Sequence, residues 1–294
     1  GKAAQRIPVG PYETGSGDFS VEHTYEDDHP ETDTPFDLLK IKVRVEDDDT
    51  GAYDGNELTL RVDNVAPVFD ALTLSSNDIV EGDTVTLEGS YVDPGKDDYK
   101  LEVDWGDGSD LEIIEFSYEI THFSIDHIYA DDEADGEDDL YTVTVKLIDD
   151  DTGEATDDLQ IHVGNAAPEI TASFDEVAIE EGDTAELTVN IDDPGTKDTF
   201  TVTVNWGDGS DSQVFENVAA GTTKFTHTHL WLDDNPTGTT SDTNTVSIKV
   251  EDDDKEFDET ETAIVVANVA PRNVDAGPAI VAASDQPFTL FGSF

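Results

Sequence analysis

The sequence predicts an all-β protein made of tandem antiparallel β-sandwiches, and three observations lead to this prediction. The stretch Val103-Asp-Trp-Gly-Asp-Gly-Ser-Asp110 returns 101 positions later as Val204-Asn-Trp-Gly-Asp-Gly-Ser-Asp211. Apolar and polar residues alternate over short segments, and no segment keeps a helical period. Gly, Asp and Pro separate these segments at the spacing typical of a sandwich, rather than that of strands alternating with helices.

Three similar linkers define the repeats. Asn64-Val-Ala-Pro67, Asn165-Ala-Ala-Pro168 and Asn268-Val-Ala-Pro271 recur at intervals of 101 and 103 residues. We expect two complete repeats, 68–168 and 169–271, in an elongated array. Residues 1–67 match only the back part of a repeat, and 272–294 match only its front strands. Further sequence of the same chain, or else a neighbouring copy of it, would complete these two ends, and the first alternative is favoured.

The strands are expected in the same order in each repeat. The sixth strand of the first complete repeat has the clearest alternation, since Val143, Val145 and Leu147 all point to one face. The strands expected in this repeat are 69–75, 84–91, 99–105, 111–116, 119–129, 140–148 and 157–163.

Acidic residues dominate the composition. The chain has 71 Asp and Glu against 14 Lys and Arg, and its formal net charge of -57 disfavours a compact state unless cations or salt screen it. Nucleic acid is not expected as a partner, because phosphate binding needs clustered Lys and Arg. The chain has no Cys, which excludes disulfides and thiolate metal sites. No apolar run is long enough to span a membrane, and Gly1 at the start suggests an excised segment.

Three motifs together resemble the PKD (polycystic kidney disease) domain family of immunoglobulin-like β-sandwiches. They are the Val-Asp-Trp-Gly-Asp-Gly-Ser strand and turn, the later His127-Ile-Tyr129, and the strand from Tyr141 to Asp149. The resemblance covers both complete repeats and both partial ones. It implies an extracellular or cell-surface module without catalytic residues, common in bacterial and archaeal surface proteins and as a spacer in secreted hydrolases. These repeats are longer than is usual for the family, and tryptophan stands where the family often has phenylalanine.

Two segments have the letters of an aspartic-protease half-site, Asp49-Thr-Gly51 and Asp151-Thr-Gly153. The third repeat has Asp254-Lys-Glu256 instead, and acidic residues precede all three segments where such an enzyme needs an apolar strand. These residues are therefore expected to form polar hairpin turns. We expect no enzymatic activity.

The aromatic residues allow two interpretations. Trp105 and Trp206 could stack on sugars, but each ends an alternating apolar strand, which favours a place in the core. His23, His127 and His229 share one repeat position and are expected to form structural hydrogen bonds rather than to bind a metal.

The acidic loops carry the strongest functional signal. Strand alternation puts the loops at Asp93 and Asp149 at the pole that receives the preceding linker, and those at Glu81, Trp105 and 131–139 at the pole that leads to the next repeat. Acidic loops of two repeats would thus surround each linker, where a cation with about six to eight oxygen ligands relieves their repulsion. We expect Ca²⁺ to bind here through Asp47, Asp48, Asp49, Asn64, Asp93, Asp149, Asp150, Asp151, Asn165, Asp193, Asp252, Asp253 and Asp254.

A second calcium motif is incomplete. Asp131-x-Glu133-x-Asp135-Gly136 begins like an EF-hand loop, but Thr142 stands where the closing glutamate would be. The alternative for all these acids is a solvated surface suited to high salt. That alternative explains a high acidic density everywhere better than it explains Asp triplets at one repeated loop.

These observations predict a structural or adhesive segment of an extracellular repeat protein, such as a stalk, surface filament or adhesin, with calcium-stiffened junctions. Its expected partners are further repeats or neighbouring copies of the chain, with cell-surface or matrix polysaccharide or protein as candidate ligands. The alternative is an accessory spacer or carbohydrate-binding region of a secreted hydrolase. A neighbouring hydrolase domain would favour that alternative.

Overall fold

The computed structural model describes residues 6–8, 17–26, 33–131, 139–234, 238–270, 272, 287 and 289. Most of the expected EF-hand-like loop and of the segment 272–294 lies outside these residues. Contacts divide the chain into two compact units, each built from several segments. Unit 1 is Gly1–Leu74, Leu87–Ile125 and Thr142–Leu159, and unit 2 is Ser75–Thr86, Asp126–Tyr141 and Gln160–Phe294.

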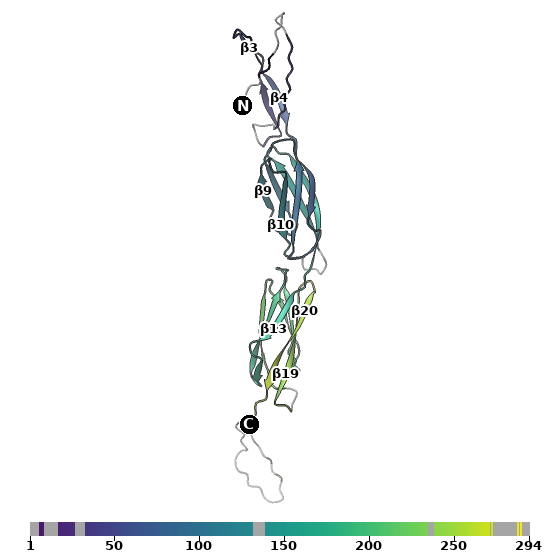
Figure 1. Cartoon of the computed structure of the whole chain (residues 1–294). Helices are drawn as coiled ribbons and strands as arrows, with labels where there is room; N and C mark the ends of the chain where they lie inside the picture. The colour runs from purple at the N-terminus through teal and green to yellow at the C-terminus, as the bar shows by residue number, and fades with distance from the viewer. Residues whose placement is uncertain are drawn as a thin grey trace. The chain divides into compact units, whose positions relative to one another are not determined.

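Every regular element in the described part of the chain is a β-strand (Figure 1). No helix there is long and apolar enough to cross a membrane. Within the first 67 residues, β1 pairs antiparallel with β4 and β2 pairs antiparallel with β3. These strands are β1 (Phe36–Ile41), β2 (Arg44–Glu46), β3 (Ala52–Asp54) and β4 (Leu58–Asp63).

The first complete repeat forms two sheets, with strand orders β10-β7-β5 and β6-β12-β11-β8-β9. Each strand expected from the alternation is present, to within a few residues at its ends. The strands are β5 (Val68–Leu74), β6 (Asp78–Val80), β7 (Thr84–Val92), β8 (Tyr99–Asp104), β9 (Glu112–Phe116), β10 (His122–Ile128), β11 (Asp139–Asp149) and β12 (Glu154–Gly164).

The second complete repeat has the same topology, with sheets β13-β15-β18 and β14-β20-β19-β16-β17. The expected all-β tandem sandwich fold is therefore confirmed. Its strands are β13 (Glu169–Phe174), β14 (Ala178–Glu180), β15 (Thr184–Asp192), β16 (Phe200–Asn205), β17 (Gln213–Val218), β18 (Lys224–Leu230), β19 (Ser241–Glu251) and β20 (Phe257–Ala267).

The first strand of each repeat is split between the two sheets, which the alternation did not reveal. β5 and β13 belong to the three-stranded sheets, whereas β6 and β14 pair parallel with the last strand of the other sheet. Both β6 and β14 are only three residues long, too short to give a periodic signal. This crossing places the turn that follows each of them, Glu81-Gly-Asp83 and Glu181-Gly-Asp183, beside the next linker.

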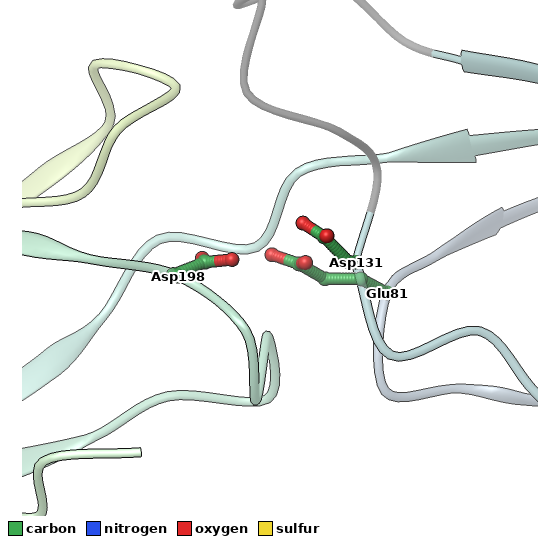
Figure 2. A group of neighbouring side chains, drawn as sticks. All are labelled: Glu81, Asp131 and Asp198. Atoms are coloured by element: carbon green, nitrogen blue, oxygen red, sulfur yellow. The ribbon is translucent and has the colours of Figure 1, made fainter. Parts of the chain in front are cut away.

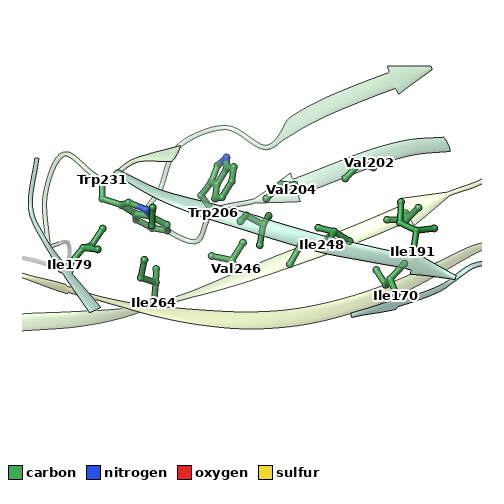
Figure 3. Close-up of a cluster of buried hydrophobic side chains, with 14 of the residues drawn as sticks. Ile170, Ile179, Ile191, Val202, Val204, Trp206, Trp231, Val246, Ile248 and Ile264 are labelled. Atoms are coloured by element: carbon green, nitrogen blue, oxygen red, sulfur yellow. The ribbon is translucent and has the colours of Figure 1, made fainter. Parts of the chain in front are cut away.

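The core of the second complete repeat lies between its two sheets (Figure 3). Trp206 and Trp231 are both fully buried and pack edge to face, with ring centroids 6.2 Å apart. Trp105 is 1% exposed in the preceding repeat. The indole N–H of Trp206 donates to Gln213 over 2.9 Å, so its polar edge has a partner inside the fold. The core interpretation of Trp105 and Trp206 is therefore confirmed, and these two rings are not available to stack on a sugar.

Candidate metal centre

Glu81 is held in the turn between β6 and β7. Its N–H donates to the carbonyl of Gly164 over 2.9 Å, and the N–H of Gly82 donates to the carbonyl of Tyr129 over 2.7 Å. Gly82 has a φ of 78°, in the left-handed region that favours glycine. The Glu81 side chain is buried, and its Oε1 accepts a hydrogen bond of 3.1 Å from the N–H of Ala166 in the linker.

Asp131 and Asp198 come from two other loops of unit 2, which also contains Glu81. Asp131 follows β10 and is half-buried, and Lys197 Nζ lies 3.9 Å from its Oδ2. Asp198 lies in the loop between β15 and β16 and is only 1% exposed. Neither of its carboxylate oxygens has a hydrogen-bond partner among the described residues. A buried carboxylate without donors is costly, so something else must satisfy it.

The three carboxylates point toward one another, and one oxygen of each lies within 4.8 Å of the others (Figure 2). Gly195 leaves room for this arrangement. A Cβ at this position would lie 2.5 Å from Asp198 Oδ2 and 2.5 Å from Glu81 Oε2. Carboxylate oxygens are the ligands that hard cations such as Ca²⁺ and Mg²⁺ prefer. The residues therefore fit a divalent cation.

The electrostatics of the site point the same way. Burial raises the pKa of Asp198, and together with the negative charge of Glu81 and other nearby acids it brings this pKa to about 8. Burial also raises the pKa of Asp193 to about 6, although the N–H of Gly195 donates to its Oδ1 over 2.8 Å. A bound cation would stabilise the ionised forms of these carboxyls.

Asp198 also belongs to a second acidic group, with Asp253 and Asp254 in the turn between β19 and β20. Asp253 Oδ1 accepts a hydrogen bond of 2.8 Å from the N–H of Thr199. Asp254 is 7% exposed. Two groups of carboxylates thus meet at one aspartate.

The first aspartate of each triplet stabilises a hairpin turn. Asp252 Oδ1 accepts from the N–H of Glu256 over 2.9 Å, and its Oδ2 accepts from the side-chain amide of Asn165 over 3.0 Å. The side-chain amide of Asn64 donates to Asp149 Oδ2 in the same way, over 2.9 Å. The linker asparagines therefore reach the triplets, as expected, by donating hydrogen bonds to their first aspartates.

A related arrangement occurs in unit 1, which contains the corresponding loops of the preceding repeat. Two acidic groups share Asp97, the residue that matches Asp198 in the repeat alignment. Asp97 is 2% exposed. The members are Asp93, Asp97 and Asp149 in one group, and Asp97, Asp150 and Asp151 in the other.

One further acidic group, in unit 2, repeats the environment of Glu81. It consists of Glu181, Asp233 and Asp234. Glu181 Oε1 accepts a hydrogen bond of 2.8 Å from the N–H of Val269 in the following linker. The contact between this turn and the next linker is thus a regular feature of the repeat.

The structure brings together about half of the residues expected to bind calcium. Asp93, Asp149 to Asp151, Asp253 and Asp254 lie in acidic groups, and Asp193 and Asp252 lie beside them. Asp47, Asp48 and Asp49 belong to no such group in the described part of the chain. Asp47 instead accepts hydrogen bonds from the N–H groups of Asp49 and Gly51 in its own turn. The role of all these residues as ligands stays a prediction.

Sequence reasoning missed Asp97 and Asp198 altogether. It placed Glu81 near the linker without counting it as a ligand, and it considered Asp131 as a ligand only at the start of the incomplete EF-hand-like loop. A signal for the aspartates existed. Asp97 and Asp198 recur at the 101-residue interval, each two positions before the third strand of its repeat. The members missed are Glu81, Asp97, Asp131, Glu181, Asp198, Asp233 and Asp234.

The protease-like letters form a hairpin turn, as expected. The N–H of Asp149 donates to the carbonyl of Gly153 over 3.0 Å, and Thr152 has a φ of 76°. The structural role expected for His229 also has support. Its Nε2 lies 2.8 Å from Asp208 Oδ2, and its ring stacks on Trp206 with centroids 4.2 Å apart.

The fold of this chain is similar to that of several solved structures. No family model matches the chain, and no curated protein matches its sequence. A tetra-tandem repeat from the extending region of a large adhesion protein is 15% identical, with a TM-score of 0.43, and the match covers 78% of this chain and 56% of that one. A PKD domain of an M14-like peptidase from Thermoplasmatales archaeon SCGC AB-540-F20 is 20% identical, with a TM-score of 0.28, covering 34% and 93%.

A segment of two fibronectin type-III domains from chicken tenascin is 16% identical, with a TM-score of 0.33, and the match covers 68% of this chain and 98% of that one. The solved structures compared thus include a PKD domain and tandem repeats. All these TM-scores are below 0.5, so no function is transferred from these proteins to the chain.

Proposed function

We propose that the chain is a structural segment of an extracellular repeat protein, a stalk, filament or adhesin, in which Ca²⁺ stiffens the connection of one repeat to the next. The buried carboxylate of Asp198 carries this proposal. It is 1% exposed, no residue in the described ranges donates a hydrogen bond to it, and it faces Glu81 and Asp131. A cation that links these loops would fix the linker between them, because Glu81 also binds the N–H of Ala166.

Solvation in high salt does not account for this site. Acidic residues that adapt a protein to brine act by binding water and ions at an exposed surface. Asp198, Glu81 and Asp254 are instead buried, at 1%, 0% and 7% exposure. Burial of several like charges is unfavourable without a counter-ion, so a specific cation explains them better.

Calcium suits the ligand set better than magnesium does. Ca²⁺ accepts about six to eight oxygen ligands in irregular geometry, whereas Mg²⁺ demands a near-ideal octahedron and keeps several of its waters. The carboxylates here come from separate loops and include nearly inaccessible ones.

The alternative of a carbohydrate-binding accessory region has lost its best candidates for sugar contact, since Trp105 and Trp206 are buried.

The test is thermal unfolding of the whole chain in calcium, in magnesium and in NaCl of equal ionic strength. A ligand that binds only the folded state adds about 2.7 kcal/mol at about 100 times its dissociation constant. We expect calcium to raise Tm well beyond the other two salts, and Asp198→Asn to abolish much of that excess. Asp211→Asn, which removes an equal charge from an exposed loop, should keep it. Equal responses to calcium and sodium would leave only screening and would rule out the proposal.

A further inference from the structure

Asp198 occupies an unusual position, because it is the one residue common to two acidic groups in the described part of unit 2. One group adds Glu81 and Asp131, and the other adds Asp253 and Asp254. The two partner pairs approach it from different loops, one pair from the turns after β6 and β10 and the other from the hairpin between β19 and β20. Asp97 is likewise common to two acidic groups in unit 1. Its pair Asp150 and Asp151 corresponds to Asp253 and Asp254, whereas its other pair, Asp93 and Asp149, comes from its own repeat and does not correspond to Glu81 and Asp131.

The chemistry of the Asp198 side chain suits a shared role. A carboxylate has two oxygens, and each can bind a different cation. Both oxygens of Asp198 are buried, and both lack a hydrogen-bond partner in the part of the chain that the structure describes. An ordinary structural aspartate in this chain uses at least one oxygen to accept N–H groups, as Asp252 does. Asp198 has both oxygens available for ligands.

The local charge also favours more than one cation. The two groups together contain five carboxylates, and one base, Lys197, has its Nζ 3.9 Å from Asp131 Oδ2 in the described part of the chain. One divalent cation would neutralise only two of the five negative charges. The remaining carboxylates would still repel one another at short range in a poorly solvated site.

We propose that Asp198 bridges two divalent cations, one held with Glu81 and Asp131 and the other with Asp253 and Asp254. This inference rests on the proposed function and adds the stoichiometry of the site. Removal of the bridge should lose both cations, whereas loss of an outer ligand should release only the cation on its own side.

The experiment counts the Ca²⁺ bound by the full chain, by equilibrium dialysis at saturating calcium and metal analysis. Relative to the wild type, we expect Asp198→Asn to bind two fewer ions, and Glu81→Gln and Asp254→Asn to bind one fewer each. The double variant Glu81→Gln with Asp254→Asn should also bind two fewer. Asp211→Asn serves as the control and should bind as many ions as the wild type. Far-ultraviolet circular dichroism and tryptophan fluorescence verify that each variant is folded.

The outcomes separate this inference from the proposed function. If Asp198→Asn and the double variant each bind only one ion fewer, the site holds a single cation, and the bridging role is wrong while the proposed function stands. If the wild type binds no more calcium at these loops than Asp198→Asn does, both proposals fail. If Asp198→Asn is unfolded, Asp198→Glu takes its place, because it keeps the charge but moves the carboxylate. We expect Asp198→Glu to bind fewer ions than the wild type, since a bridge between two cations needs the carboxylate at the position that aspartate gives it.

Discussion

At the scale of single residues, position decides what a carboxylate does in this protein. Asp208 and Asp198 lie in the same repeat, yet their pKa values move in opposite directions. Burial raises the pKa of Asp198 to about 8. Burial also acts to raise the pKa of Asp208, but hydrogen bonds from Ser210 and His229 outweigh it, so that pKa is lowered. Asp208 is thus a satisfied structural acceptor, and Asp198 is a carboxylate that lacks a counter-charge.

The substitution Asp208→Ala tests the structural role. It removes hydrogen bonds of 2.9 Å from the N–H of Ser210 and 2.8 Å from the imidazole of His229, and should cost about 1–3 kcal/mol at neutral pH. A lowered carboxyl pKa contributes stability that is present above the unfolded pKa and is lost as pH falls through the folded pKa. The difference between variant and wild type should therefore shrink below about pH 4. Urea unfolding in chelator at several pH values measures it, and a cost that is independent of pH would contradict this role.

At the scale of elements, alternation along each strand separates the core from the surface. β19 buries Val246, Ile248 and Val250, while Thr245 and Ser247, on either side of Val246, are exposed. Its register with β20 is continuous over the whole strand, and Ile248 pairs with Thr260. One register slip would turn the apolar face to water, so this pattern fixes the pairing.

The substitution Ile248→Ala should lower the free energy of unfolding by about 2–5 kcal/mol, because it removes a side chain that is 1% exposed and leaves a cavity. Thr245→Ala, on the exposed face of the same strand, is the matched control and should change stability by no more than about 0.5 kcal/mol. Chemical unfolding followed by tryptophan fluorescence compares the two. Similar losses for both variants would mean that β19 does not bury the face assigned to it.

At the scale of the whole molecule, the net charge of -57 makes stability depend on ionic strength. Charges repel over about 10 Å in 0.1 M salt and over about 3 Å in 1 M salt. Self-repulsion acts on all exposed acids, whereas the cation site depends on a few buried ones.

We therefore expect that raising NaCl from about 0.1 to about 1 M increases Tm of the chelated wild type and of Asp198→Asn by similar amounts. Scanning calorimetry in chelator measures both. The two proteins must be compared because a rise of Tm in NaCl that is confined to the wild type would show that sodium occupies the Asp198 site. That result would contradict the assignment of the NaCl effect to screening alone.

The sequence by itself determined the fold class and nearly every strand of the two sandwiches. The reason is that the alternation of apolar and polar residues in strands such as β11 and β19 depends only on neighbouring residues, and the same pattern recurs at a fixed interval along the chain. The turn chemistry at Asp149 and the buried place of Trp105 and Trp206 follow from neighbours within a few residues. The Asp triplets could likewise be recognised as a repeated acidic loop.

Only the tertiary structure decided which acids meet. Glu81, Asp131 and Asp198 are far apart in the sequence, and they converge because the short strand β6 crosses to the other sheet and carries its turn to the linker. The structure also distinguishes the aspartates by their hydrogen bonds. Asp252, the first aspartate of its triplet, accepts hydrogen bonds from a backbone N–H and from an asparagine amide, whereas Asp198 accepts none from the described residues. Burial and the absence of donors depend on all surrounding loops at once, so periodicity along the chain cannot reveal them.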